Sequence, residues 1–361
     1  MTSLIDLGRE WFREANTLPD VVAGRCVHTL LETATCQACA DVCPREAWLI
    51  DDEQLGIDVN RCDGCRLCVA ACPQGAIQAA VTPLIKTHGG NGIAMLACQP
   101  SGAHAADGVV PCIHALSLTS LMGLYRQGVR TLLSCSAHCD GCERGKAPRL
   151  DDQITHLNML LDARGLPAIR HETQTPAEWS RRAVPQPGDA AAGPSMSRRQ
   201  FFRRAGRDVL SGQQQLSTMD AAAATGYEPP GRLLPRHPAA QMAVVSPQIN
   251  GVRCNACDAC AQLCPHEAID LQLDEQGNGS AYRIMPDACS GCGICVDVCD
   301  QGAVTLHHWA VPTQEQLELA NHNCRACGSP YRLPAGRKTE QQLCWICART
   351  NHHRLLFQVL E

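Results

Sequence analysis

Cysteines are the residues of this chain that are best placed to do chemistry, and they occur in ordered groups. Two groups follow the spacing C-x2-C-x2-C-x3-C, the first from Cys254 to Cys264 and the second from Cys289 to Cys299. Thiolates two residues apart wrap one corner of an iron–sulfur cubane, and the fourth thiolate points away towards a neighbouring cluster. The spacing therefore predicts two 4Fe–4S clusters with crossed ligands, one on Cys254, Cys257, Cys260 and Cys299, and one on Cys289, Cys292, Cys295 and Cys264.

These two groups resemble the ligand runs of the two-cluster bacterial ferredoxins, which are small electron carriers. The resemblance implies a ferredoxin module in this part of the chain. A set of disulfides and a zinc site are the alternative interpretations, and two complete copies of the spacing in tandem disfavour both of them.

A second pair of groups lies nearer the start of the chain, and one of its members is incomplete. In the earlier group Thr33 stands where the first cysteine is expected, and Cys26 is the obvious replacement. His28, and a cluster with an open or non-cysteine position, are the alternatives. The later group is complete and predicts a cluster on Cys62, Cys65, Cys68 and Cys43. With Cys26 as fourth ligand, the neighbouring cluster is held by Cys26, Cys36, Cys39 and Cys72.

The residues between these cysteines would tune the reduction potentials of the clusters. Small residues such as Gly64 and Gly291 let backbone amides approach sulfur. Negative charge disfavours the reduced cluster, so we expect Asp63 and Asp258 to lower the potentials of their clusters and Arg66 to raise that of its own.

Five more cysteines lie between the two pairs, in a stretch of different character. Residues 93–98 and 129–135 are predicted to be buried strands that end in cysteine, and residues 113–127 and 153–164 are predicted to be helices. This alternation indicates a small α/β domain with a mainly parallel sheet, whose carboxyl edge is where ligands usually bind. Buried structural thiols are the alternative to a metal or iron–sulfur site. Such a site would use Cys98, Cys112, Cys135, Cys139 and Cys142.

This middle stretch resembles the small iron–sulfur (delta) subunit of methyl-viologen-reducing hydrogenases. The similar features are LAC at residues 96–98, VPC at residues 110–112 and SCSAHCDGC at residues 134–142. In that family, cysteines at strand ends hold a 2Fe–2S cluster and pass electrons to a heterodisulfide reductase. The resemblance therefore implies an additional iron–sulfur cluster in the middle of this chain.

A stretch rich in proline, alanine and glycine at residues 183–194 predicts an exposed linker. The string Ser197–Arg204 that follows resembles a twin-arginine export signal. Because it lies mid-chain and no apolar segment follows it, we expect a basic amphipathic helix instead. From this string to Cys299 the chain is similar to the accessory ferredoxins of periplasmic nitrate reductase systems. That resemblance implies several 4Fe–4S clusters, a cytoplasmic location and a larger redox enzyme as partner.

The last cysteines form two C-x2-C pairs that are separated by sixteen residues. This spacing is typical of a structural zinc site, in which four thiolates close a tetrahedral shell. Iron in a rubredoxin-like site is the alternative. His352 and His353 are expected on the surface, because the shell is already full. We therefore predict a zinc-ribbon-like tail with the metal ligands Cys324, Cys327, Cys344 and Cys347.

Composition limits the other functions that the chain can have. It has 361 residues, 25 cysteines, 4% aromatic residues and a formal net charge of −5. Clustered thiols without a preceding secretory signal indicate a reducing, cytoplasmic location, and the acidic balance disfavours nucleic acid as a partner. No apolar run is long enough to cross a bilayer. No nucleotide-binding, haem-attachment or hydrolase motif occurs, so we expect no catalytic residues.

Together these patterns predict an α+β protein in which two bacterial dicluster ferredoxin modules flank a small α/β domain. The expected order is an N-terminal helix (1–25), the first module (26–85), the α/β domain (86–180), a linker with the basic helix (181–245), the second module (246–310) and the zinc-ribbon-like tail (311–361). We expect the chain to relay single electrons through about four 4Fe–4S clusters, as an accessory or subunit of a larger oxidoreductase. One alternative is a redox-sensing scaffold or maturation factor that binds its partner through the ribbon and the basic helix. Another is a catalytic subunit that binds substrate at an open cluster.

Overall fold

The computed structural model describes residues 18–50, 55–88, 91–105, 107–144, 149–184, 227–235, 242–337 and 342–350. Three expected features lie outside these residues: residues 1–17 of the N-terminal helix (1–25), the basic helix at Ser197–Arg204, and the side chains of His352 and His353. The end of the expected N-terminal helix is not α-helical, because residues 20–25 form strand β1 (Asp20–Val21) and a 3-10 turn (Ala23–Arg25). The chain forms two compact units, one up to Ala239 and one from Ala240 onward, except that residues 33–35 group with the second unit. No helix in the described ranges is both long and apolar enough to cross a membrane.

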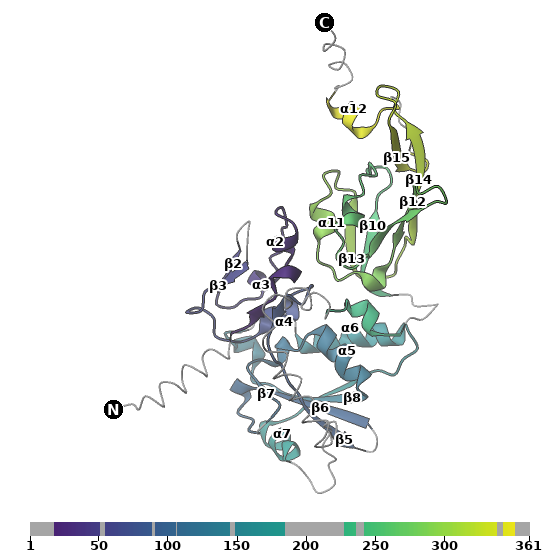
Figure 1. Cartoon of the computed structure of the whole chain (residues 1–361). Coiled ribbons are helices and arrows are strands. Elements are labelled where there is room, and N and C mark those ends of the chain that lie inside the picture. Colours follow the sequence, from purple (N-terminus) through teal and green to yellow (C-terminus); the bar gives the residue numbers. More distant parts are fainter. Residues whose placement is uncertain are drawn as a thin grey trace, which may run out of the picture. The chain divides into compact units, whose positions relative to one another are not determined.

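The first cysteine module, residues 18–78, is built from short elements around its cysteines (Figure 1). Strand β1 pairs antiparallel with β4, and β2 forms a hairpin with β3. Its core mixes cysteine thiols with a few apolar side chains such as Trp48 and Ile77, which is the composition of a small module that depends on metal for stability. The elements are β1 (Asp20–Val21), α2 (Val27–Leu30), α3 (Ala38–Asp41), β2 (Trp48–Ile50), β3 (Leu55–Ile57), α4 (Leu67–Ala71) and β4 (Ile77–Gln78).

The middle domain, residues 84–183, is organised around a five-stranded sheet (Figure 1). Neighbouring strands are parallel apart from β5, which forms an antiparallel hairpin with β6. Parallel pairing of β6 with β8 puts their last residues, Cys98 and Cys135, at the same carboxyl edge of the sheet. The strands are β5 (Leu84–His88), β6 (Asn91–Cys98), β7 (Val109–Val110), β8 (Val129–Cys135) and β9 (Arg170–Thr173).

Helices cover both faces of this sheet. On one face, α5 (Leu118–Arg126) and α6 (Leu150–Asp162) pack against each other (Figure 1). On the other face lies α7 (Pro176–Ala183), whose Trp179 is fully buried against Met95 of β6 and Leu133 of β8. The domain therefore has a conventional apolar core, unlike the cysteine modules.

The segment predicted as one helix over residues 113–127 is divided in two. A 3-10 turn at Ile113–Ala115 comes first, and α5 begins only after Ser117. The Ser117 hydroxyl accepts the N–H of Ser120 at 3.1 Å and so caps the helix. Because the turn is separate from the helix, Cys112 and His114 lie at the cysteine-rich edge of the sheet.

Residues 227–235 also belong to the first unit. The Tyr227 hydroxyl donates to the carbonyl oxygen of Pro73 at 2.6 Å, and the Tyr227 ring lies directly against Gly75. Gly75 has a positive φ of 56°, so a side chain there would be strained and would also collide with the ring. The end of the expected linker is therefore seated on the first cysteine module, next to Cys72.

The second cysteine module, residues 243–310, contains a long antiparallel pair formed by β10 (Ala243–Ile249) and β13 (Val304–Ala310), and the short helices α10 (Ala259–Gln262) and α11 (Ile294–Asp297). The C-terminal ribbon comprises β14, β15 and α12 (Trp345–Thr350). Its hairpin continues the module's own antiparallel sheet, which has the order β11-β12-β14-β15. These strands are β11 (Ile269–Leu273), β12 (Gly279–Ile284), β14 (Gln316–Asn323) and β15 (Pro330–Pro334).

Candidate iron–sulfur and metal centres

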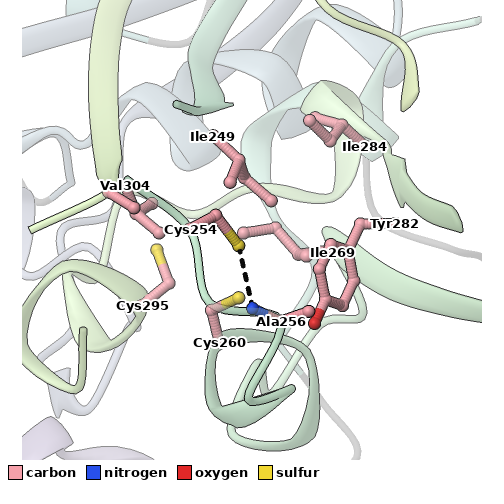
Figure 2. Close-up of a cluster of buried hydrophobic side chains, with 10 residues drawn as sticks. Ile249, Cys254, Ala256, Cys260, Ile269, Tyr282, Ile284, Cys295 and Val304 are labelled. Carbon is pink, nitrogen blue, oxygen red and sulfur yellow. Dashed lines mark hydrogen bonds between the residues drawn. The ribbon is translucent and has the colours of Figure 1, made fainter. Parts of the chain in front are cut away.

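The cysteine loops of the second module coil through left-handed backbone conformations. Ala256 and Asp258 have φ values of 55° and 65°, and Gly291 and Gly293 take the same region in the other loop, with φ values of 81° and 87°. The coil turns backbone amides towards sulfur, and the Ala256 N–H donates to Sγ of Cys254 at 3.4 Å (Figure 2). Loops of this kind bring cysteines two residues apart to one side of the chain, as cubane ligation requires.

Each fourth cysteine is held by the alanine four residues after it. All four alanines are at most 2% exposed, so a larger side chain has no room at these positions. An N–H donor favours the thiolate over the thiol, so the repeated contact prepares each crossed sulfur for iron. The sequence repeats this alanine, but the repeat alone did not predict a contact between its N–H and sulfur. The N–H groups of Ala47, Ala76, Ala268 and Ala303 donate to Sγ of Cys43, Cys72, Cys264 and Cys299, at 3.4, 3.3, 3.1 and 3.2 Å.

The fold brings the members of each predicted quartet close together. Burial, and then the charges of Cys36, Cys72 and Cys26, raise the pKa of Cys39 to about 12. Burial, and then Cys254, Cys257 and Cys299, raise the pKa of Cys260 to about 12. In the two other quartets, burial and neighbouring thiols likewise raise the pKa values of Cys68 and Cys289. Iron cations at the centre of a quartet would offset both burial and repulsion, so the donor sets fit 4Fe–4S clusters.

Two of the quartets line small apolar cavities of similar size. One cavity, of about 20 Å³, is lined by Cys264, Cys289, Cys292 and Cys295. The other, of about 20 Å³, is lined by Cys26, Cys36, Cys39 and Cys72. Cys26 thus takes the place of the cysteine that is missing from the spacing at Thr33. His28 lines the same cavity, but its Nε2 lies 2.8 Å from the Cys36 carbonyl oxygen and serves as a donor to it.

A third cavity, of about 20 Å³, lies in the middle domain, where four of the five predicted cysteines line it. Cys135 is not among them. It is completely buried and packs with Met95 and Trp179, beneath α7. The cysteines at this cavity are Cys98, Cys112, Cys139 and Cys142.

Two hydrogen bonds at the middle cavity end on sulfur. The Leu150 N–H donates to Nδ1 of His114 at 3.0 Å, so the ring proton is on Nε2, which lies 3.4 Å from Sγ of Cys139. The Ala137 N–H donates to Sγ of Cys98 at 3.4 Å. Burial raises the pKa of Cys112 to about 11. Clustered thiols with N–H donors aimed at sulfur are the chemistry of a metal or iron–sulfur site.

The middle cavity adjoins the first cysteine module, within the same unit. Cys112 packs with Cys65 and Leu67 in one apolar cluster. Beside them, Arg144 Nε lies 3.1 Å from the Asp63 carboxylate, and Arg144 Nη1 donates to the Pro111 carbonyl at 2.7 Å. Although burial raises it, the Arg144 guanidinium and the Cys65 N–H hold the pKa of Asp63 below its usual range.

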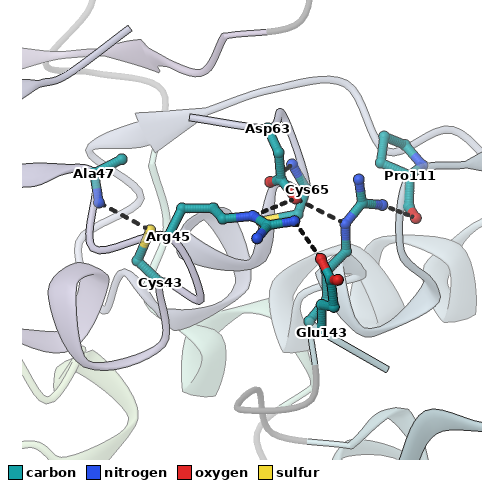
Figure 3. Close-up of polar contacts among 8 residues, drawn as sticks. Cys43, Arg45, Ala47, Asp63, Cys65, Pro111 and Glu143 are labelled. Atoms are coloured by element: carbon teal, nitrogen blue, oxygen red, sulfur yellow. Dashed lines mark hydrogen bonds and ion pairs between the residues drawn. The ribbon is translucent and has the colours of Figure 1, made fainter. Parts of the chain in front are cut away.

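The junction is completed by an outer ion pair. Arg45 lies 3.5 Å from Asp63 and 2.6 Å from Glu143, the residue that follows Cys142 (Figure 3). The carboxylate that was expected to lower the potential of its cluster is therefore neutralised by two arginines. No sequence signal pointed to the contact with Arg144, because Arg144 is 81 residues from Asp63 along the chain.

The four tail cysteines come together at the ribbon. Their sulfur atoms all lie within 4.8 Å of one another, and Sγ of Cys327 is 3.9 Å from that of Cys344. Zn–S bonds of about 2.3 Å in a tetrahedron would place sulfurs about 3.8 Å apart, so the geometry fits a four-thiolate metal site. Burial raises the pKa of Cys324, but hydrogen bonds from the N–H groups of Cys344, Cys327 and Ala326 lower it by more. The net result is a pKa of about 6. Cys324 is thus prepared to bind metal as a thiolate.

Comparisons with known proteins match the two cysteine modules. Residues 253–303 match the 4Fe-4S dicluster domain family, and residues 55–78 match the 4Fe-4S binding domain family. The chain is a ferredoxin-domain protein. The two matches support 4Fe–4S clusters in these domains and an iron–sulfur electron-transfer function.

Relatives of the ferredoxin domains occur in several redox systems. Electron transport protein HydN of Escherichia coli is 37% identical over 71 residues, which is 19% of this chain and 41% of HydN. Pyruvate synthase subunit PorD of Methanocaldococcus jannaschii is 39% identical over 59 residues, or 16% of this chain and 63% of PorD. Pyruvate:ferredoxin oxidoreductase of Moorella thermoacetica is 28% identical over 195 residues, or 48% of this chain and 16% of that enzyme. The chain thus spans less than two thirds of each relative.

Proposed function

We propose that this ferredoxin-domain protein relays single electrons through five iron–sulfur clusters, as an accessory or subunit of a larger cytoplasmic oxidoreductase. Bound clusters would accept and release one electron each. The two cysteine modules supply two quartets apiece, and the middle domain supplies the fifth. The observation that supports this relay most directly is the packing of Cys65 and Leu67 against Cys112. This contact joins a quartet of the first module to the cysteines of the middle domain.

The residues of the first unit have distinct tasks in this relay. Amide N–H groups hold the sulfurs as thiolates, the apolar lining excludes water, and Arg144 balances Asp63 between the two neighbouring quartets. Three quartets therefore follow one another in this unit, from that of Cys26 through that of Cys65 to that of Cys112.

The middle quartet fits a cluster of cubane size. Its cavity, of about 20 Å³, equals in size the two cavities of about 20 Å³ that the ferredoxin-type quartets line. We therefore infer a 4Fe–4S cluster on Cys98, Cys112, Cys139 and Cys142, in place of the 2Fe–2S cluster on strand-end cysteines that the hydrogenase resemblance implies. Cys135 has a structural role in this proposal, since it lies in the core beneath α7.

The partner is expected to be a larger redox enzyme. The relatives include an electron transport protein, a pyruvate synthase subunit and an oxidoreductase, which supports a role beside such an enzyme. Cys257 is an exposed ligand candidate and lines a polar cleft together with Trp345 of the ribbon. A partner that contacts this cleft would come close to the quartet of Cys257.

Iron and sulfide analysis of anaerobically purified variants tests the proposal. The wild type should contain about 20 iron atoms in clusters, four for each quartet. Cys98→Ser should lose about four of them, whereas Cys135→Ser, the matched control in the same domain, should keep them all. Equal iron contents in the wild type and Cys98→Ser would reject the middle cluster.

A further inference from the structure

The C-terminal ribbon supplies three arginines to the loops around one quartet, that of Cys254, Cys257, Cys260 and Cys299. The most buried contact is the ion pair between Arg332 of β15 and Asp258, whose side chains are 24% and 12% exposed. Asp258 also accepts a hydrogen bond from the buried Tyr282 hydroxyl at 2.5 Å. Because Asp258 directly follows Cys257, the Arg332 guanidinium lies beside the ligand loop of this quartet.

The other two arginines reach neighbouring ligand segments. Arg337 donates to the carbonyl oxygen of Cys254 itself. Arg349 of α12 pairs with Asp300, the residue after Cys299, at 2.9 Å. Both side chains of the Arg349 pair are well exposed, so solvent screens its charge far more than that of Arg332. The electrostatic effect should therefore be largest for Arg332 and smallest for Arg349.

Glycine at position 279 leaves room for the Arg332 side chain to reach Asp258. A Cβ atom at this position would overlap Nη1 of Arg332. The overlapping atom is the far end of a flexible side chain, so Gly279→Ala would displace the guanidinium without disturbing the backbone of β12. This substitution moves the charge away from Asp258 but leaves it on the ribbon.

The ribbon's four thiols anchor the segments that carry these arginines. β15 begins three residues after Cys327, and Arg349 lies two residues after Cys347. The buried core of the ribbon consists of Cys324, Cys344 and Cys347, with few apolar side chains around them. Small cysteine-centred segments of this kind lose their structure without metal, so metal loss would release the arginines.

We propose that the metal-bound ribbon raises the reduction potential of the cluster on Cys254, Cys257, Cys260 and Cys299, by holding Arg332 and Arg337 against its ligand loops. Reduction adds negative charge to a cluster, and nearby positive charge stabilises the reduced state. Without Arg332, the negative charge of Asp258 would destabilise the reduced cluster and lower its reduction potential. The ribbon is thus a metal-dependent device that sets the potential of one cluster. The proposal depends on the proposed function, because it requires a cluster on this quartet.

Redox titration of the full chain, followed by electron paramagnetic resonance (EPR), tests the inference. The affected signal is identified by its change in a Cys257→Ser variant. Arg332→Gln should lower the reduction equilibrium constant of that cluster about tenfold, which is about 59 mV for one electron. Gly279→Ala should lower the reduction potential of the same cluster. Arg332→Lys, which keeps the positive charge, should retain most of the wild-type potential. Arg283→Gln, which removes the exposed pair with Asp270 on the same sheet, should leave it unchanged.

The role of the metal is tested by removing two of its ligands. Cys324→Ser/Cys327→Ser should produce a downward shift at least as large as that of Arg332→Gln, because metal loss releases both Arg332 and Arg337. The triple variant, which adds Arg332→Gln, should show no additional shift. An unchanged potential in Arg332→Gln, with full iron content, would overturn the inference. A shift in Arg332→Gln but none in the double cysteine variant would overturn the metal dependence. Absence of the wild-type signal would instead contradict the proposed function, so the two failures are distinguishable.

Discussion

Replacing Arg144 tests the junction between the first cysteine module and the middle domain. Its side chain and that of Asp63 are only 19% and 20% exposed, so Arg144→Gln would leave a mostly buried carboxylate with the longer 3.5 Å contact to Arg45. Hydrogen bonds to charged groups contribute about 1.5–3 kcal/mol, and the remaining arginine favours the lower part of that range. We therefore expect a loss of about 2 kcal/mol. For a unit of this size, that loss is a decrease of about 4–8 °C in the apparent Tm.

The assay is anaerobic thermal unfolding followed by circular dichroism and by the visible absorbance of the clusters. The matched control is Arg149→Gln, which removes an exposed pair with Asp140, where the side chains are 52% and 86% exposed, and should leave the apparent Tm unchanged. Because the pKa of Asp63 is lowered in the fold, its stabilising effect is complete above the unfolded pKa of about 3.9 and is lost as pH falls through the folded pKa. The Arg144→Gln decrease should therefore be equal at pH 6 and pH 8.

Two results would refute this reasoning. One is an unchanged apparent Tm in Arg144→Gln, which would mean that the junction contributes nothing to stability. The other is a decrease that differs between pH 6 and pH 8, which would assign the effect to a group other than Asp63.

Three further predictions concern other parts of the chain. Cys26→Ala should lose about four iron atoms while His28→Ala keeps them, as elemental analysis would show; the reverse result would make His28 the ligand. Trp179→Ala should destabilise the middle domain by about 3–5 kcal/mol, because the side chain is fully buried, and amide hydrogen exchange in β6 and β8 would increase; unchanged exchange would contradict the packing of α7. Mass spectrometry under native conditions should find one zinc ion per chain, which Cys327→Ser loses without any loss of cluster absorbance; iron at that site would contradict the zinc assignment.

Much of the arrangement of cysteines followed from spacing alone. In the complete ferredoxin-type groups, each quartet combines three cysteines of one group with the fourth cysteine of its paired group, as the spacing predicted. Strands β6 and β8 lie where buried strands ending in cysteine were predicted. Spacing is informative here because a cubane constrains its ligands to a few local geometries. The match to 4Fe–4S domain families confirms the ferredoxin-type modules.

The contacts that adjust these sites could not be predicted in the same way. Asp63 and Asp258 were expected to lower potentials, but each is paired with an arginine more than 70 residues away along the chain. Cys135 illustrates a second limit. Side chains alternate between the two faces of a strand, so the sequence showed that Cys135 shares a face with Leu133 but not that α7 covers that face.

The central claim is that cysteine quartets make this chain a relay for single electrons. It is tested most directly by reductive titration of the anaerobic full-length protein, with EPR used to count the electrons taken up. We expect about five electrons per chain, one for each 4Fe–4S cluster. A colourless, folded protein that takes up no electrons would contradict it.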